Sequence, residues 1–339
     1  MKKIILGLPQ TFSLYAAIKK NLEFHGFEVI DISYPNHTFK YKNFRQRIVN
    51  ALRKVFLKDK HYKNTLIFNH YKKEILQTLH TIETPTDYAL LIRADVYPKG
   101  VLKLIKQKTK KMVAYHWDGL DRFPQIYDYL KYFKRFFVFD SKDLKKTELA
   151  LLPTTNFAFD YDSNIQIKAP EYDVFFIGSF LHQRMHKIEY FIKKATSLNQ
   201  KVNFIIHYSE KIDSKKFPLK EIKYTDTHLT YQENIKHLKN ATIVIDFLNE
   251  THHGLSFRTF EAMYYGKKLI TNNPLIKEYE FYHPNNIFVW DGENLEGYEA
   301  FIKIPFSPIA PKLIEKYSFK NWINYILDIK PYIPIIHPD

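Results

Sequence analysis

An arginine and a glutamate lie one helical turn apart late in the chain, in the stretch His252–Asn273. A helix opening near Ser256 would present unpaired backbone N–H groups and the positive end of its dipole to an anion. Arg258 adds a guanidinium that can bind a phosphate through two donors. Glu261 has two acceptor oxygens that suit the paired hydroxyls of a ribose. These residues predict a nucleotide site, and the alternative is a capped surface helix with an Arg–Glu pair.

A glycine-containing turn supplies a second candidate for phosphate binding. Gly178 and Ser179 follow an apolar stretch and precede a helical stretch that contains Arg184. Glycine allows a backbone to approach a phosphate closely, and an arginine can neutralise a diphosphate. The segment is not a G-x-G-x-x-G fingerprint, so a plain tight turn is the alternative.

Candidate acids and bases lie in two loops. Asp118 follows a strand of the first half, where side chains face the ligand crevice of open α/β sheets, and its carboxylate can deprotonate an acceptor hydroxyl. The alternative is a turn formed with Gly119. His116 and Asp121 share this loop and can serve instead. His253 precedes the Arg258 helix and can donate to a phosphate or a sugar hydroxyl, or it belongs to a solvated loop.

Strands and helices alternate in two series, which is typical of parallel sheets with crossover helices. The first series has expected strands at 4–8, 27–32, 88–92, 112–115 and 136–139, with helices at 12–24 and 100–107. The second has expected strands at 174–177, 202–206, 243–247 and 269–271, with helices at 184–197, 231–239 and 256–265. We therefore expect two Rossmann-like domains, 1–165 and 166–315, facing each other across a cleft. The segment 316–339 holds a C-terminal helix, opening at Ser318, that packs back.

The second series also carries a family resemblance. The pattern G-L-S-x-R-x-F-E-A-x-x-x-G is met by Gly254, Leu255, Ser256, Arg258, Phe260, Glu261, Ala262 and Gly266. It resembles the C-terminal signature of GT-B glycosyltransferases of the spore-maturation-protein type and of related lipopolysaccharide and capsule biosynthesis transferases. Three further segments match in the family's order, namely 114–118, 137–143, and 172–179 with Arg184. The resemblance covers residues 88–273.

The resemblance implies roles for the candidate residues. The donor nucleotide would be bound by Gly178, Ser179, Arg184, Ser256, Arg258 and Glu261. Within that set, Glu261 would hold the ribose, and the two arginines would stabilise the diphosphate as leaving group. Asp118 or His116 would serve the acceptor side, with His253 beside the sugar. Related transferases carry a glutamate at the position of His253, so retention or inversion of configuration stays open.

A D-x-D motif, the metal signature of a different glycosyltransferase architecture, occurs at Asp160 and Asp162. It lies between the two series rather than at a strand end, so we expect no metal site there. The resemblance implies a nucleotide-diphosphate sugar as co-substrate and no further cofactor.

The net charge of the chain indicates an anionic partner. The sequence has 51 Lys and Arg and 36 Asp and Glu, which gives a net charge of +15. The chain has no cysteine, which excludes disulfides and thiolate metal sites. Its start is read as a strand rather than a signal peptide, and no stretch approaches the roughly 20 apolar residues of a membrane span. We therefore expect a cytoplasmic protein.

A basic amphipathic helix is expected at 45–56. Ile48, Leu52, Val55 and Phe56 fall on one face, and Arg45, Arg47, Arg53 and Lys54 lie beside or opposite it. Such a helix can lie on an anionic membrane at the inner face of the cell, where a lipid-linked acceptor would be found. The alternative is a stripe packed onto the first domain. No aromatic-rich RNA-binding motif appears, so a nucleic-acid partner is not expected.

These expectations combine into a metal-independent glycosyltransferase that moves a sugar from a nucleotide-diphosphate sugar to a surface-glycan acceptor such as lipopolysaccharide, capsule or a lipid-linked oligosaccharide. One alternative is a non-catalytic glycan- or nucleotide-binding protein of the same fold. A second is a basic nucleic-acid-binding protein, which a steep salt dependence of affinity would reveal. Specificity for sugar, nucleotide base and acceptor is expected in the loops 9–13, 93–97 and 207–230.

Overall fold

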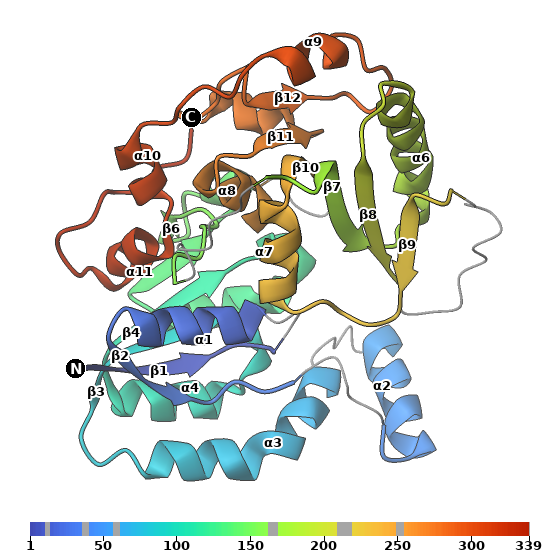
Figure 1. The fold of residues 1–339 in the computed structure, drawn as a ribbon. Coiled ribbons are helices and arrows are strands. Elements are labelled where there is room, and N and C mark those ends of the chain that lie inside the picture. The colour runs from blue at the N-terminus through green and yellow to red at the C-terminus, as the bar shows by residue number, and fades with distance from the viewer. Residues whose placement is uncertain are drawn as a thin grey trace. The chain divides into compact units, whose positions relative to one another are not determined.

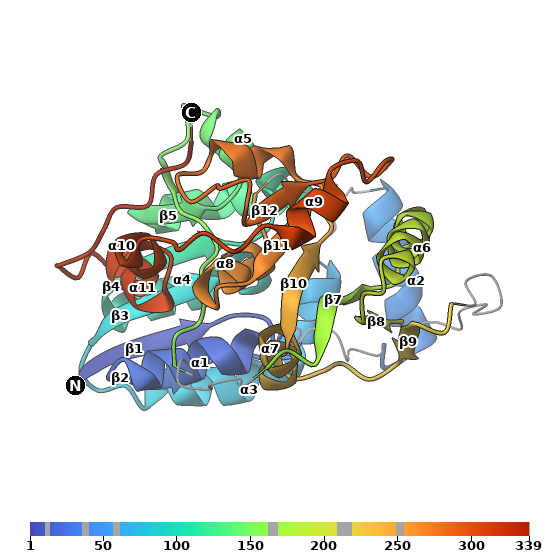
Figure 2. The ribbon, with the colours of Figure 1, turned by 45° about the horizontal axis from the view of Figure 1, so that its top comes forward.

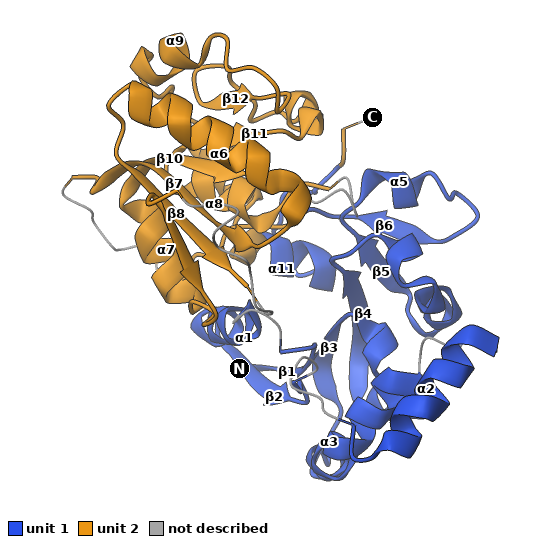
Figure 3. Cartoon of the chain, turned by 90° about the vertical axis from the view of Figure 1, so that its right-hand side faces the viewer, with its two compact units in different colours: residues 1–155, 322–336 blue, residues 156–321, 337–339 orange. Residues whose placement is uncertain are grey.

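The computed structural model describes residues 1–10, 14–35, 41–56, 62–161, 169–208, 219–248 and 254–338. The chain divides into two compact units, shown in Figure 3. Unit 1 comprises Met1–Thr155 together with Trp322–Ile336, and unit 2 comprises Asn156–Asn321 together with the residues from His337. Each unit is built on a six-stranded sheet. No helix in the described ranges has the length and apolar character that crossing a membrane requires.

The sheet of unit 1 has the order β2-β1-β3-β4-β5-β6, and every neighbouring pair is parallel. Its strands are β1 (Lys2–Gly7), β2 (Phe27–Asp31), β3 (Thr86–Ile92), β4 (Thr109–His116), β5 (Arg135–Val138) and β6 (Leu151–Pro153). The helices are α1 (Leu14–Phe24), α2 (Phe44–Phe56), α3 (Tyr62–His80), α4 (Lys99–Gln107) and α5 (Ser141–Leu144), with the 3₁₀ turns η1 (Ala94–Val96), η2 (Leu120–Arg122) and η3 (Pro124–Tyr132). The central strands are apolar almost throughout because helices cover both faces of the sheet.

The C-terminal helix α11 (Phe319–Leu327) belongs to unit 1 from Trp322 onward. Trp322 meets Tyr115 of β4 edge-on with ring centroids 5.3 Å apart, and Tyr325 meets Phe137 of β5 at 5.5 Å. Arg135 donates to the last carbonyls of the helix, those of Tyr325 and Ile326, at 3.0 and 3.1 Å. The expected helix that packs back on the fold is therefore confirmed.

The sheet of unit 2 has the order β12-β11-β10-β7-β8-β9 and is also entirely parallel (Figures 1 and 2). Its strands are β7 (Tyr172–Ser179), β8 (Val202–His207), β9 (Ile222–Thr225), β10 (Ala241–Asp246), β11 (Lys268–Thr271) and β12 (Ile287–Val289). The helices are α6 (His182–Ser197), α7 (Tyr231–Lys239), α8 (Phe257–Tyr264), α9 (Tyr298–Lys303) and α10 (Pro311–Lys316), with the 3₁₀ turn η5 (Pro274–Glu278).

Unit 2 has a topological switch point between β7 and β10. The chain runs outward from β7 to β8 and β9, and then returns to place β10 on the other side of β7. In open α/β sheets the helices that follow such a pair of strands leave in different directions, and this arrangement marks the carboxyl ends of the two strands as a ligand position. Ligands of open α/β sheets bind at this position, so the ends of β7 and β10 locate the candidate site.

Candidate functional site

The first turn of α8 is fixed by a serine at the switch point. Ser256 is the N-cap, and its Oγ accepts a hydrogen bond from the backbone N–H of Arg258 at 3.1 Å. The same hydroxyl donates to Oδ2 of Asp246, at the end of β10, at 2.8 Å. The structure therefore confirms a helix opening at Ser256, and Asp246 anchors this helix start to the sheet.

Arg258 points its guanidinium to the end of β7. Its Nη1 donates to the carbonyl oxygen of Ile177 at 2.6 Å. Its Nε is buried and has no hydrogen-bond partner among the described residues. A guanidinium carries five N–H donors, so one bond fixes its position and leaves further donors for an anion.

Arg184 brings a second guanidinium to the same place from the first turn of α6. Its Nη1 would lie 3.6 Å from a Cβ built on Gly178, and its Nε is likewise buried with no partner in the described part of the chain. Burial lowers the pKa of Arg184, Asp246 acts against that shift, and the nearby charge of Arg258 adds to it. Two half-buried, incompletely paired cations that repel each other form a site that an anion would stabilise.

Gly178 is required by the packing at the end of β7. A Cβ at this position would lie 2.8 Å from a ring carbon of Phe176, which is closer than side chains pack. Ser179, the last residue of β7, is exposed. Gly178 and Ser179 are the last two residues of β7 and pair with β8, rather than forming a turn after the strand as the sequence predicts, and contact with a phosphate stays a prediction.

Glu261 lies in the second turn of α8 and is 2% exposed. Burial raises the pKa of its carboxyl to about 7, while the charge of Arg258 and the hydroxyl of Tyr231 act in the opposite direction. The Tyr231 hydroxyl is also buried, and its placement falls short of a well-formed hydrogen bond. As the carboxyl lies here it is enclosed, so the predicted ribose contact requires a side-chain movement.

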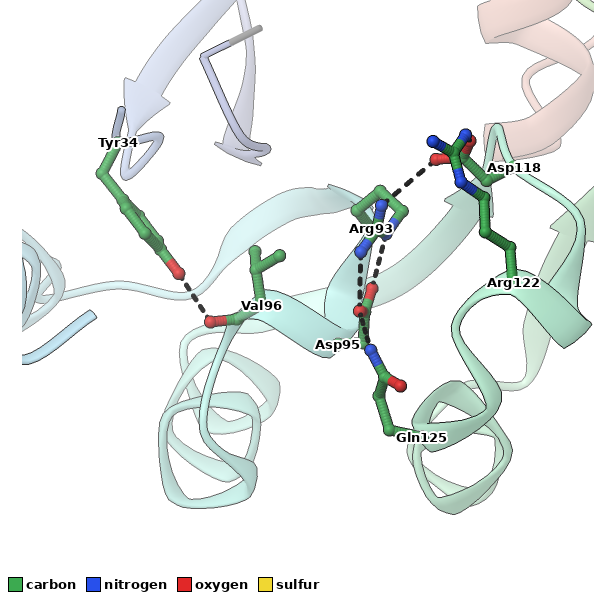
Figure 4. A network of polar contacts seen from close by, with 7 residues as sticks. All are labelled: Tyr34, Arg93, Asp95, Val96, Asp118, Arg122 and Gln125. Carbon is green, nitrogen blue, oxygen red and sulfur yellow. Dashed lines mark hydrogen bonds and ion pairs between the residues drawn. The ribbon is translucent and has the colours of Figure 1, made fainter. Parts of the chain in front are cut away.

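In unit 1 the predicted base Asp118 lies between two arginines (Figure 4). Its Oδ2 accepts a hydrogen bond from Nη1 of Arg93 at 3.1 Å, and its Oδ1 accepts one from Nη1 of Arg122 at 2.6 Å. The side chain keeps 14% of its surface exposed. Both oxygens are thus engaged, and a proton-accepting role requires that one ion pair opens.

Arg93 is the centre of this unit 1 network. Its Nε and Nη2 bind both oxygens of the buried Asp95 at 2.8 and 2.9 Å, and Gln125 donates to the same carboxylate at 3.0 Å. The guanidinium also lies over the ring of Phe123, 3.4 Å from its centroid. The backbone of Arg93 is left-handed, with φ at 61°, a conformation that costs a non-glycine residue about 1–3 kcal/mol. The ion pairs hold it there.

His116, the alternative base, is fully buried at the end of β4. Neither ring nitrogen has a hydrogen-bond partner among the residues that the structure describes. Burial lowers the pKa of the imidazole to about 4, partly opposed by the charge of Asp95, so the ring is neutral near pH 7. As it lies, His116 does not reach solvent, and its predicted catalytic role remains a prediction.

The remaining residues that the sequence predicts as functional add little to either site. His253 and Asp162 lie outside the described residues. Asp160 accepts a hydrogen bond from the backbone N–H of Lys320 at 3.0 Å, which ties it to the first turn of α11. Asp121 pairs with Lys146 at 2.9 Å on the surface of unit 1. Within the described ranges no group of three or more histidine, aspartate or glutamate side chains is placed to hold a metal ion.

Sequence comparisons identify no relative, since neither a family model nor a curated protein matches the chain. Solved structures do match. A trehalose-6-phosphate synthase studied with bisubstrate glycomimetics has a TM-score of 0.57 at 10% identity, and an OtsA apo structure has 0.57 at 8%. Each match covers 98% of this chain and 100% of the other.

A third match is a trehalose-6-phosphate protein from E. coli bound with UDP-2-fluoro glucose. Its TM-score is 0.53 at 7% identity, over 90% of this chain and 92% of that one. At such identities the likeness concerns the fold alone. Together with the two parallel six-stranded sheets, it shows that this chain has the GT-B fold with two Rossmann-like domains, as the sequence predicts.

Proposed function

We propose that this protein is a glycosyltransferase that uses a nucleotide-diphosphate sugar as donor. The observation that carries the proposal is the convergence of Arg184 and Arg258 at the switch point of unit 2, each with a buried Nε that has no partner among the described residues. Paired guanidinium groups beside the strand end at Gly178 fit a diphosphate in charge and in donor geometry. The GT-B fold supports the same assignment by analogy.

The chemistry follows from this arrangement. The bond between the anomeric carbon and the diphosphate oxygen breaks, and the anomeric carbon forms a bond to an acceptor oxygen. The two arginines stabilise the charge that develops on the departing diphosphate, a role that a metal ion fills in other transferases. Glu261 holds the ribose hydroxyls in its ionised form. We propose that the reaction is therefore metal-independent.

On the acceptor side, Asp118 is the proposed base that takes the proton of the attacking hydroxyl. It retains exposed surface, whereas His116 has none. His253 would stand beside the sugar. The resemblance of the segment 254–266 to the spore-maturation-protein type supports an acceptor that is a surface glycan, such as lipopolysaccharide, capsule or a lipid-linked oligosaccharide. We place this activity in the cytoplasm, at the inner face of the cell membrane.

Calorimetric titration tests the donor site. UDP, GDP, ADP, CMP and CDP are titrated into the wild type and into Glu261→Ala, with a chelator present, and UDP comes first because the E. coli structure binds a UDP sugar. The matched control is Glu299→Ala, which removes an exposed carboxylate from a surface pair with Lys303. We expect micromolar binding of one diphosphate that is lost in Glu261→Ala and kept in the control. Failure of the wild type to bind any of them would disprove the site.

A non-catalytic binding protein of the same fold is the second candidate. It is favoured by one observation, that both oxygens of Asp118 are held by arginines. The two candidates differ in turnover. An enzyme releases free nucleoside diphosphate from the bound donor when a suitable acceptor glycan is added, whereas a binding protein releases the donor intact.

A further inference from the structure

Helix α2 turns its apolar face to solvent. None of its residues is buried. The exposed fractions are 74% for Phe44, 43% for Ile48, 49% for Leu52, 70% for Val55 and 76% for Phe56. At 100° per residue these five side chains form one stripe. Figure 3 shows α2 at the periphery of unit 1.

The polar side of α2 makes the contacts with its surroundings. Asn50 donates to the hydroxyl of Tyr41 at 2.9 Å, and the side-chain oxygen of Gln46 accepts from the backbone N–H of Lys42 at 3.0 Å. Arg53 lies over the ring of Tyr62, 4.9 Å from its centroid. A surface helix of a water-soluble protein has the opposite arrangement, with its apolar stripe against the core. Packing of the stripe onto unit 1, the alternative that the sequence left open, is not found among the described residues.

The charge of α2 is of one sign. The helix carries Arg45, Arg47, Arg53 and Lys54 and no acidic residue. Arg47 and Lys54 lie on one side of the apolar stripe and Arg53 lies on the other, while Arg45 falls within the stripe beside Phe56. Long basic side chains at these edges can extend their cations to the level of phosphate headgroups while the stripe between them is immersed.

We propose that α2 is an interfacial helix that inserts its apolar stripe into a lipid bilayer containing anionic lipids. The stripe is about 20 Å long and a single helix wide, which suits a planar surface better than a protein groove. The basic edges complement a negatively charged membrane. This inference concerns unit 1 and does not rest on the donor site in unit 2, so vesicle binding and nucleotide binding can fail separately.

Flotation of the full chain with vesicles tests the apolar stripe. The vesicles contain phosphatidylcholine alone or phosphatidylcholine mixed with phosphatidylglycerol. We expect the wild type to float with the mixed vesicles, and the variant Phe44→Ser/Val55→Ser/Phe56→Ser to lose at least about tenfold in partitioning, because each change removes apolar area from the membrane. These side chains are already exposed, so the fold is kept. The matched control Phe24→Ser alters a phenylalanine on α1 that is 60% exposed, and it should float as the wild type does.

A second pair of variants tests the charge. Arg47→Gln/Lys54→Gln should weaken binding to the mixed vesicles by about tenfold or more, since each basic residue near an anionic surface contributes to binding. Lys103→Gln/Lys106→Gln on α4 removes the same charge from another exposed face and should leave it unchanged. The affinity for the nucleoside diphosphate, measured by calorimetry, should be the same in all of these variants.

Two outcomes would overturn the proposal. The first is wild-type protein that stays with the soluble fraction in the presence of mixed vesicles. The second is serine substitution at Phe44, Val55 and Phe56 without any change in flotation. If a second copy of the chain covered the stripe instead, the wild type would form a dimer that the serine variant loses, and it would not float.

Discussion

Arg258 and Ile177 join the start of α8 to the end of β7 through one hydrogen bond of 2.6 Å, from the guanidinium to the backbone carbonyl. The bond crosses the switch point and ends one residue before Gly178. It therefore sets the distance between the two elements that the sequence predicts to bind phosphate. Arg258 thus holds these two elements together and also supplies positive charge to the site.

Replacing Arg258 by alanine should lower the affinity for a nucleoside diphosphate by roughly tenfold to a hundredfold, because hydrogen bonds to charged groups contribute about 1.5–3 kcal/mol. The free energy of unfolding should fall by only about 1 kcal/mol, the contribution of one hydrogen bond. Titration calorimetry and thermal unfolding measure the two effects. Arg258→Lys keeps the charge but not the forked donors, and it should restore little of the affinity. Full affinity in Arg258→Ala would remove this residue from the site.

Glu261 should make the stability of unit 2 depend on pH. Its folded pKa, about 7, lies above the ordinary value of 4.5, so the folded state binds the extra proton. The stabilisation is complete below pH 4.5 and is lost as the pH rises through about 7, by on the order of 3 kcal/mol at about 1.4 kcal/mol per pKa unit. The difference in unfolding free energy between the wild type and Glu261→Gln, measured in denaturant across this range, isolates the effect. A constant difference would contradict it.

The same titration should affect nucleotide binding in the opposite sense. Ribose hydroxyls donate to a carboxylate better than to a carboxylic acid, so affinity should rise as the pH passes through about 7. Titration calorimetry at several pH values shows whether it does. In Glu261→Gln the rise should disappear.

Gly178→Ala should remove nucleotide binding and lower stability by about 1–3 kcal/mol, the usual effect of overpacking, because the new Cβ would meet the ring of Phe176 at 2.8 Å. The matched control is Gly100→Ala, where nothing lies within 4 Å of the new Cβ at the start of α4. That change should leave stability equal or slightly higher. Chemical unfolding and nucleotide titration of both variants make the comparison, and equal behaviour would count against a tight strand end.

Asp118→Asn should keep nucleotide binding and reduce sugar transfer by roughly 10²–10⁴-fold, the usual contribution of a general base. Asp128→Asn removes a carboxylate from an exposed pair with Lys99 in the same unit and serves as the control. The assay measures release of nucleoside diphosphate in the presence of acceptor. Transfer that survives in Asp118→Asn would exclude this carboxylate as the base.

Asp95→Asn should destabilise unit 1 by about 3–5 kcal/mol, because it leaves the buried cation of Arg93 with an incomplete partner set. Asp87→Asn breaks an exposed pair with Lys110 and should change stability by less than about 1 kcal/mol. Urea unfolding gives both values. A small effect at Asp95 would mean that Asp118 and the ring of Phe123 are sufficient to hold the guanidinium.

The features that the sequence predicts correctly are local ones. The β7 and β10 strands are continuous apolar runs, and the α8 start has a serine cap, so each is encoded within a few residues. The strands β9 (Ile222–Thr225) and β12 (Ile287–Val289) are missed, because three or four residues are too few to show a periodic pattern. The long helix α3 (Tyr62–His80) is missed as well, since its apolar periodicity is interrupted by polar residues.

Features that depend on tertiary contacts are not encoded in this way. Arg93 and Asp95 are only two residues apart, yet their importance comes from Asp118, Phe123 and Gln125, which the fold brings to them. The sequence pattern that could have identified Arg93 and Asp95 is an Arg-x-Asp directly after a buried strand. Likewise, periodicity predicts that α2 is amphipathic, but not which face it turns to the protein.

The return of α11 to unit 1 has a consequence for biosynthesis. A ribosome completes Met1–Thr155 before it makes any of unit 2, but Trp322 and Tyr325, which cover Tyr115 and Phe137, are made only after Asn156–Asn321. The nascent first unit therefore waits, with part of its apolar surface uncovered, until more than a hundred further residues have been translated. A product that ends before Trp322 would contain Met1–Thr155 without the helix that covers it, so this unit could not complete its folding. Such a product is expected to be bound by chaperones and degraded by proteases.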